Sequence, residues 1–126
     1  MSESRNPGKA IILVVDDEPM LRMVGIDLAD EAGFEALEAA NADEAILLLE
    51  SRQDIRLIFT DIDMPAGSMN GLKLAAAVRR RWPPIEIIVV SGHYQARLED
   101  LPDGALFFSK PYLNDTIVDA MKRLVA

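Results

Sequence analysis

Five short, mostly apolar runs, separated by segments with helical periodicity, constrain the fold of this chain more than any other feature. The runs cover residues 10–15, 34–38, 57–61, 85–90 and 105–109. Each is too short for a buried helix, and most are rich in β-branched residues, which is typical of strands buried on both faces of a sheet. Strands that alternate with helices predict right-handed crossovers and a parallel sheet with helices on both faces.

Helices are predicted between and after these strands from local start and stop signals. They cover residues 18–32, 41–52, 70–81, 96–101 and 115–124. Asn41 and Glu44 have the spacing of a capping box at the start of the second helix. Pro102 and Gly104 should leave the fourth helix short or frayed. The first helix is expected to bury the residues that follow a three-four spacing, Leu21, Val24, Leu28 and Ala32.

Composition limits the class of protein. A chain of 126 residues, 50% hydrophobic and 27% charged, is expected to form one globular domain over residues 10–126, after a flexible polar tail at residues 1–9. The lack of cysteine excludes disulfides, thiolate nucleophiles and Cys-based metal sites. The net charge of −8 argues against direct nucleic-acid binding. No signal peptide or membrane-spanning apolar run is present, so we expect a cytoplasmic protein.

Polar residues follow four of the predicted strands, at the edge where the carboxyl ends of all strands meet. They are Asp16 and Asp17 after the first strand, Asp61 at the third, Ser91 after the fourth and Lys110 after the fifth. Alone, an acid after a strand is usually a helix cap or turn residue, and a lysine before proline is usually solvent-exposed. Together at one edge they indicate a ligand site, because parallel sheets bind ligands there.

The charge of this edge indicates its chemistry. Three crowded carboxylates repel one another unless a cation lies among them, and hard oxygen ligands favour Mg²⁺ over zinc or copper. A cation would keep Asp61 ionised, and an ionised carboxylate can attack phosphorus to form an aspartyl phosphate. Lys110 and the Ser91 hydroxyl are then candidates to stabilise the phosphoryl oxygens. We therefore expect Mg²⁺-dependent phosphoryl chemistry at Asp61, with Mn²⁺ as an alternative metal.

Four short motifs at these strand ends resemble those of a known family. They are Val14-Val15-Asp16-Asp17-Glu18-Pro19, Thr60-Asp61-Ile62-Asp63-Met64-Pro65, Val90-Ser91-Gly92 and Ser109-Lys110-Pro111. In this order they resemble the four signature blocks of the receiver domain of bacterial two-component response regulators. The resemblance implies a flavodoxin-like (βα)5 fold, similar to the chemotaxis response regulator, with a five-stranded parallel sheet of order 2-1-3-4-5 between two layers of helices.

The resemblance also implies a phosphorelay function. Asp61 would accept a phosphoryl group from the phosphohistidine of a histidine kinase or phosphotransfer protein. Asp17 would bind Mg²⁺ directly, Asp16 largely through water, and Asp63 through its backbone carbonyl. Such a receiver is a phosphoacceptor that assists its own phosphotransfer and dephosphorylation, so we do not expect a turnover enzyme.

Conformational switching and the lifetime of the phosphate are implied at further positions. Ser91 would be drawn toward the phosphoryl group, Lys110 would be its counter-ion, and Phe107 falls at the family's switch aromatic. Asp63 and His93, two residues after the acceptor and the switch hydroxyl respectively, would border the path of the attacking water and tune dephosphorylation.

The chain departs from the family pattern at three places. The loop at 66–71 is about two residues longer than usual, Gly92 stands where alanine is commoner, and the segment between Ser91 and Lys110 is short. Pro111 follows the lysine as the family's often cis proline does. Because nothing follows the last helix, we expect no effector domain. Output would pass to another protein, or the chain would drain phosphate from a shared kinase, as a monomer or a weak phosphorylation-dependent dimer.

Two alternatives remain open. Residues 57–63 also resemble the opening motif of haloacid-dehalogenase-like phosphohydrolases, in which the first acid is the nucleophile and the second a general acid. Against this, the acid pair precedes the motif here, and no acid lies near a strand end after Lys110. The other alternative is a degenerate receiver that docks its partners without phosphorylation, which the complete acid set disfavours.

Overall fold

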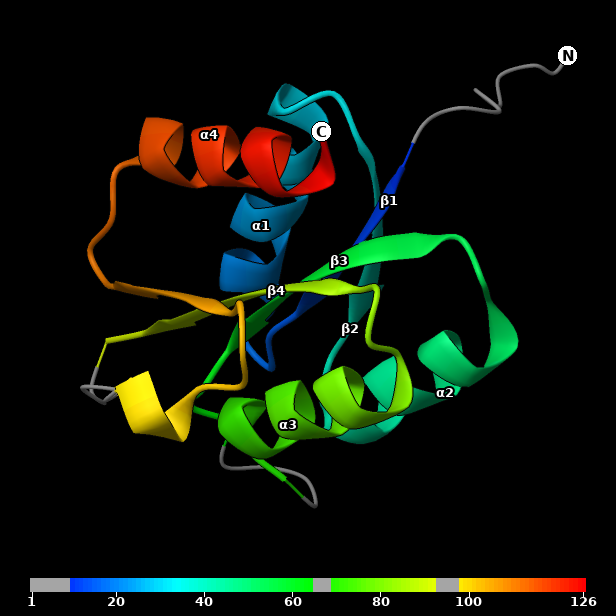
Figure 1. The fold of residues 1–126 in the computed structure, drawn as a ribbon. Coiled ribbons are helices and arrows are strands. Elements are labelled where there is room, and N and C mark those ends of the chain that lie inside the picture. Colours follow the sequence, from blue (N-terminus) through cyan, green and yellow to red (C-terminus); the bar gives the residue numbers. More distant parts are fainter. Residues whose placement is uncertain (1–9, 65–68, 93–97) are drawn as a thin grey trace, which may run out of the picture.

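The structure, a computed structural model, describes residues 10–64, 69–92 and 98–126. Its centre is a five-stranded parallel sheet of order β2-β1-β3-β4-β5 (Figure 1). The strands are β1 (Ile11–Val15), β2 (Glu35–Ala39), β3 (Ile55–Asp61), β4 (Glu86–Ser91) and β5 (Leu106–Ser109). All five strands and their order are as predicted from the sequence, with ends that differ by one or two residues.

Helices cover both faces of this sheet. They are α1 (Pro19–Glu31), α2 (Ala42–Ser51), α3 (Gly71–Arg81) and α4 (Asn114–Val125). Helices α1 and α4 lie on one face, and α2 and α3 on the other (Figure 1). Between β4 and β5, the described residues hold only a single 3-10 turn, η1 (Leu98–Asp100), in place of the fourth predicted helix. Within the described ranges, no helix combines the length and apolar character needed to cross a membrane.

Each face of the sheet has its own apolar cluster, because successive side chains of a strand point to opposite sides. In β1, Ile11, Leu13 and Val15 pack toward α2 and α3. Ile12 and Val14 pack toward α1 and α4. These side chains are almost fully buried. A rigid, doubly covered sheet therefore supports the residues at its carboxyl edge.

The buried face of α1 differs from the prediction. Leu28 is buried as expected, but Leu21 and Val24 are 43% and 39% exposed. The reason is a close approach at Gly25, where a Cβ atom would lie only 2.6 Å from Cγ1 of Val14. The helix rests on the sheet along the line of Gly25 and Leu28, and this rotates the side chains of its first turns outward.

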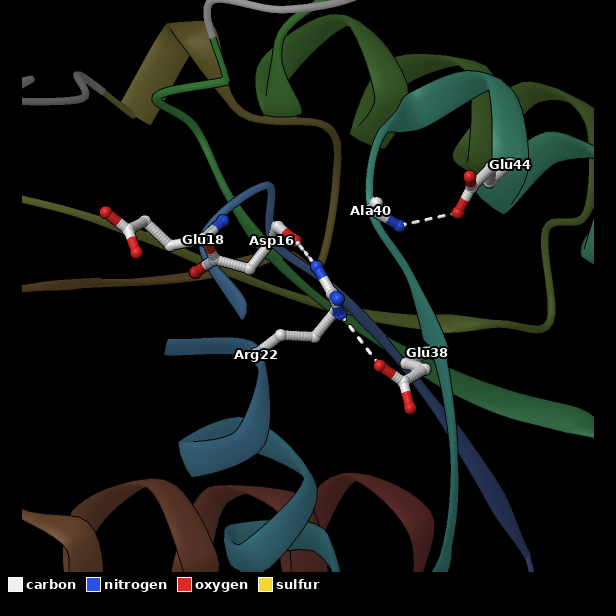
Figure 2. A network of polar contacts seen from close by, with 6 residues as sticks. All are labelled: Asp16, Glu18, Arg22, Glu38, Ala40 and Glu44. Atoms are coloured by element: carbon white, nitrogen blue, oxygen red, sulfur yellow. Dashed lines mark hydrogen bonds and ion pairs between the residues drawn. The ribbon is translucent and has the colours of Figure 1, made fainter. Parts of the chain in front are cut away.

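Side-chain caps set the start of two helices on the other face. Asn41 accepts a hydrogen bond from the backbone N–H of Glu44 at 2.9 Å. The carboxylate of Glu44 reaches back to the N–H of Ala40 at 2.8 Å, one residue before the cap that the capping-box pattern predicts (Figure 2). Asn70 caps α3 in the same way, accepting from the N–H of Lys73 at 3.0 Å.

Candidate functional site

The structure brings the predicted site residues together at the carboxyl edge of the sheet. Asp16 and Asp17 directly follow β1, Asp61 ends β3, Ser91 ends β4, and Lys110 directly follows β5. The ends of the last two strands are joined, because the N–H of Lys110 donates to the carbonyl of Ser91 at 2.8 Å. These side chains therefore lie at one edge of the sheet, as expected for the ends of parallel strands.

Three carboxylates form the centre of the site. Asp16, Asp17 and Asp61 each offer an oxygen, and these atoms lie within 4.8 Å of one another. Asp16 and Asp61 are buried, and Asp17 is half-buried. The Nζ atom of Lys110 lies 3.5 Å from Oδ1 of Asp61, which makes an ion pair. Within the described part of the chain this buried oxygen accepts no hydrogen bond.

Burial and like charge raise the pKa values of two of these acids. Desolvation raises the pKa of Asp61 to about 6, an effect that the Lys110 ammonium opposes and the Asp16 carboxylate strengthens. Desolvation also raises the pKa of Asp16, although the backbone N–H of Glu18 donates to its Oδ1 at 2.9 Å. Burial and the same two acids raise the pKa of Tyr112. The site therefore has an excess of buried negative charge that suits a cation.

A network of polar contacts from Arg22 on α1 holds the acidic loop (Figure 2). Arg22 donates through Nη1 to the backbone carbonyl of Asp16 at 2.8 Å, and through Nε to the carboxylate of Glu38 on β2, also at 2.8 Å. The sequence analysis missed Arg22. The available signal was a lone basic residue in the first turns of a helix that follows an acid pair.

Two further residues meet beside the centre of the site. The hydroxyl of Ser91 donates to Oδ2 of Asp63 at 2.7 Å. Phe107 pairs with Val89 across β4 and β5 and packs, half-buried, against the apolar cluster on the α2 and α3 face. The switching roles of Ser91 and Phe107 stay predictions, and the sequence analysis did not predict the contact between Ser91 and Asp63.

The loop beyond β3 is closed by Gly71, which the sequence analysis also missed. A Cβ atom on Gly71 would lie 2.1 Å from the backbone oxygen of Asp61, so only glycine fits. Of the other predicted positions, His93 lies outside the described residues, as do residues 66–68 of the lengthened loop. The peptide bond between Lys110 and Pro111 is cis.

An open cavity of about 420 Å³ leads to the carboxylates. It is lined by Asp17, Glu18, Leu21, Asp61, Asp63, Gly92 and Lys110. Large apolar side chains are exposed close in sequence to two of its lining residues, Leu21 and Lys110. Met20 on α1 is 78% exposed and Leu113, which precedes α4, is 76% exposed. The arrangement offers a charged cavity for a small anion and a cation.

A doubly wound parallel sheet of order 2-1-3-4-5, with an acidic cluster at its carboxyl edge, defines a flavodoxin-like domain. The model of the response regulator receiver domain family matches residues 12–122, and the chain belongs to this family. The family resemblance found in the sequence and the predicted fold class are confirmed.

Known proteins of this family resemble the chain over most of its length. The nitrogen assimilation regulatory protein NtrX of Azorhizobium caulinodans is 30% identical over 115 residues, which cover 89% of this chain and 25% of that protein. The chain thus spans about a quarter of the length of such curated relatives.

Solved structures share the fold along nearly the whole chain. A response regulator receiver protein from Sinorhizobium medicae is 26% identical with a TM-score of 0.84, covering 95% of this chain and 97% of that one. The response regulator TrrA of Thermotoga maritima, solved in complex with Mg²⁺–BeF, is 30% identical with a TM-score of 0.74, covering 91% and 98%.

Proposed function

We propose that this receiver domain accepts a phosphoryl group on Asp61, in a Mg²⁺-dependent reaction with the phosphohistidine of a histidine kinase or phosphotransfer protein. Mn²⁺ would serve as a substitute metal. The observation that carries the proposal is the convergence of Asp16 and Asp17 on Asp61, within 4.8 Å, with the Lys110 ammonium 3.5 Å away. The phosphorylated chain would then pass the signal on through Ser91, Phe107 and Lys110.

Asp61 has the properties of a nucleophile. With a pKa of about 6, its carboxyl is mostly ionised near pH 7, and its Oδ1 accepts no hydrogen bond from the described residues. In the proposed transfer, a carboxylate oxygen forms a bond to phosphorus while the bond from phosphorus to the donor's imidazole nitrogen breaks. The imidazole leaves with the electron pair of that bond and takes up a proton.

The donor set of the site fits a hard divalent cation. Asp16, Asp17 and Asp61 offer carboxylate oxygens, the ligands that Mg²⁺ prefers, and the cavity leaves room for water and phosphoryl oxygens. We propose that these residues, with the backbone carbonyl of Asp63, hold the metal. When bound, Mg²⁺ would neutralise charge on the carboxylates and on the phosphoryl group. The Mg²⁺–BeF complex of TrrA supports this assignment by similarity.

Lys110 and Ser91 would stabilise the transferred group and link it to the sheet. The Lys110 ammonium already faces Asp61, so it can pair with a phosphoryl oxygen. The backbones of Lys110 and Ser91 are hydrogen-bonded, and Phe107 pairs with Val89 in the same two strands. A shift of Ser91 toward the phosphoryl group would therefore also move the backbone of β5, which is hydrogen-bonded to β4.

Labelling with acetyl phosphate tests the acceptor. Native protein with Mg²⁺ should gain the mass of one phosphoryl group, and chelation of the metal should prevent it. Asp61→Asn should not label, while Asp63→Asn, which alters the neighbouring acid, should still label. Equal labelling of Asp61→Asn and the native protein would move the acceptor elsewhere. No labelling of the native protein would favour the phosphorylation-independent docking receiver.

Turnover distinguishes this function from the phosphohydrolase alternative. A receiver takes one phosphoryl group per chain and releases it slowly, so it should not hydrolyse a phosphate monoester in excess over protein. Incubation with p-nitrophenyl phosphate and Mg²⁺ measures this directly. Many turnovers per chain that Asp61→Asn abolishes would establish an enzyme.

We further propose that the phosphodonor protein docks on the exposed apolar side chains where α1 and α4 begin. Four apolar side chains in the first two turns of α1, among them Met20 and Leu21, are exposed. Contiguous exposed apolar patches mark interaction surfaces. Met20→Lys together with Leu113→Lys should slow phosphotransfer from the cognate kinase, yet leave labelling by acetyl phosphate unchanged. Leu47→Lys, a position that is 65% exposed on the opposite face in α2, is the matched control. Equal transfer rates for all three proteins would contradict the docking proposal.

A further inference from the structure

The hydrogen bond between Ser91 and Asp63 joins the end of β4 to the loop after β3 before any phosphoryl group is present. Ser91 is completely buried at the end of β4, and Asp63 is half-buried two residues beyond the end of β3. Their distance, 2.7 Å between Oγ and Oδ2, is that of a strong hydrogen bond. Because the acceptor is a carboxylate, the bond is charge-assisted and about twice as strong as a neutral one.

A serine hydroxyl has a single proton, so it donates to one acceptor at a time. While Ser91 donates to Asp63, it has no proton to donate to an oxygen of a phosphoryl group on Asp61. The two acceptors, the Asp63 carboxylate and the phosphoryl group, therefore compete for the same hydroxyl. The free energy of the contact between Ser91 and the phosphoryl group therefore includes the free energy needed to break the contact with Asp63.

We infer that Asp63 is a positioning residue that holds the Ser91 hydroxyl in the unphosphorylated state, and that this contact sets how strongly phosphorylation drives the switch. The inference rests on the proposed function of Asp61. A weaker contact should shift the chain toward its phosphorylated conformation, and by reciprocity should tighten binding of a phosphoryl mimic. Since the backbone of Ser91 is bonded to Lys110, the contact also acts on the β5 end of the site.

A substitution of Asp63 changes the local charge as well as the contact with Ser91, so a single variant does not separate the two effects. Replacing this carboxylate with an amide weakens the contact with Ser91, but it also removes a negative charge near the place where the phosphoryl group binds. The charge effect persists when Ser91 is replaced with alanine, whereas the contact effect does not. A double-mutant cycle of the two residues therefore isolates the contact.

The test measures affinity for beryllofluoride, a phosphoryl mimic, with saturating Mg²⁺ by isothermal titration calorimetry. The four proteins are the native chain, Asp63→Asn, Ser91→Ala and the double variant. Asp63→Asn should tighten binding about three- to tenfold more in the native background than in the Ser91→Ala background. Far-UV circular dichroism and Mg²⁺ affinity confirm that each variant is folded with its metal site intact.

A second measurement reports the contact without beryllofluoride. In the metal-free native protein, NMR scalar couplings should show one Ser91 χ1 rotamer, and Asp63→Ala should make this rotamer average. Equal gains in the two backgrounds, or a Ser91 rotamer unaffected by Asp63→Ala, would overturn the inference. Failure of the native protein to bind beryllofluoride would instead overturn the proposed function of Asp61, and the switching role of Asp63 with it.

Discussion

Asp61 must carry its charge in surroundings that disfavour it. Its side chain is buried, Asp16 lies beside it, and its pKa is raised to about 6. The proposed chemistry needs the ionised form, so at neutral pH the metal-free protein is destabilised by the residue that we propose as the phosphoacceptor. A bound cation would remove this destabilisation.

Neutralising this side chain should therefore stabilise the metal-free fold. We expect Asp61→Asn to raise the free energy of unfolding at pH 7 by about 1–2 kcal/mol and to abolish the stabilisation by millimolar Mg²⁺. Thermal unfolding with and without Mg²⁺ measures both effects. Asp27→Asn, an exposed position on α1, is the control and should respond to Mg²⁺ like the native protein. A variant at Asp61 that Mg²⁺ still stabilises fully would place the metal elsewhere.

The pH dependence of this effect has a definite sign. The pKa of Asp61 is above its ordinary value of 3.8, so the folded state holds the proton more tightly than the unfolded state. Its contribution to stability is full below about pH 4 and is lost as the pH rises through about 6. In metal-free buffer, the stability difference between Asp61→Asn and the native protein should grow over this range and then level off. A constant difference would mean that Asp61 is not perturbed.

Two glycines beside the site differ in whether a side chain would fit at their position. A Cβ atom on Gly71 would meet the backbone oxygen of Asp61 at 2.1 Å, and backbone has little freedom to move. A Cβ atom on Gly92 would lie 3.7 Å from Cβ of Lys110, which is ordinary contact. Gly71→Ala should destabilise the fold by about 3 kcal/mol, and Gly92→Ala by less than about 0.5 kcal/mol. Urea unfolding of both variants decides this, and equal stabilities would refute the steric argument.

At the scale of single residues, the sequence predicts positions better than contacts. Asp61 and Lys110 could be placed at one site because each follows a strand, and parallel strands end at the same edge. The contact of Ser91 with Asp63 depends on side-chain rotamers, which periodicity does not determine. The same holds for Arg22, whose guanidinium reaches two segments that are distant in sequence.

Among the elements, α1 links the acidic loop to the edge of the sheet. Arg22 makes this link, since its guanidinium donates hydrogen bonds both to the carbonyl of Asp16 and to the carboxylate of Glu38 on β2 (Figure 2). Glu38 is largely exposed, so the ion pair itself adds little stability. The bond to the backbone of Asp16 matters more, because it orients a loop that supplies two carboxylates.

Replacing Arg22 should lower the affinity for the metal more than the stability of the fold. We expect Arg22→Ala to weaken Mg²⁺ binding about tenfold while lowering the free energy of unfolding by only about 1 kcal/mol. Titration calorimetry with Mg²⁺ measures the affinity. Arg52→Ala breaks an exposed ion pair with Asp54 outside the site and should leave Mg²⁺ affinity unchanged. Identical affinities for both variants would show that Arg22 does not orient the loop.

Helix α1 also shows a limit of hydrophobic periodicity, which does not determine which face of this helix is buried. A three-four spacing predicts that a helix has a buried face, but the N-terminal turns of α1 carry apolar residues on more than one side. Which side faces the sheet is decided by the close approach at Gly25, where the absence of a side chain lets the helix touch Val14. Leu21 and Val24 are left exposed by this contact, which no local pattern encodes.

Across the whole molecule, the acidic site and the single tryptophan lie at opposite edges of the sheet. Trp82 follows α3 and precedes β4, and the guanidinium of Arg81 lies 4.4 Å from the centre of its ring. The site lies where β3 and β4 end. One apolar cluster connects the two regions, because it contains Ile85 near Trp82 and Met64 near Asp61. The sheet should therefore unfold as one cooperative unit.

This continuity predicts that a metal bound at one edge stabilises the other. At a Mg²⁺ concentration ten times its Kd, the free energy of unfolding should rise by about 1.4 kcal/mol, and the melting temperature by about 4–6 °C. Trp82 fluorescence and far-UV circular dichroism should report the same midpoint and the same shift. In Asp61→Asn, both probes should again agree with each other, but neither should respond to Mg²⁺. A shift seen by circular dichroism and absent from Trp82 fluorescence would show that the two edges unfold separately, and that the shared apolar cluster does not couple them.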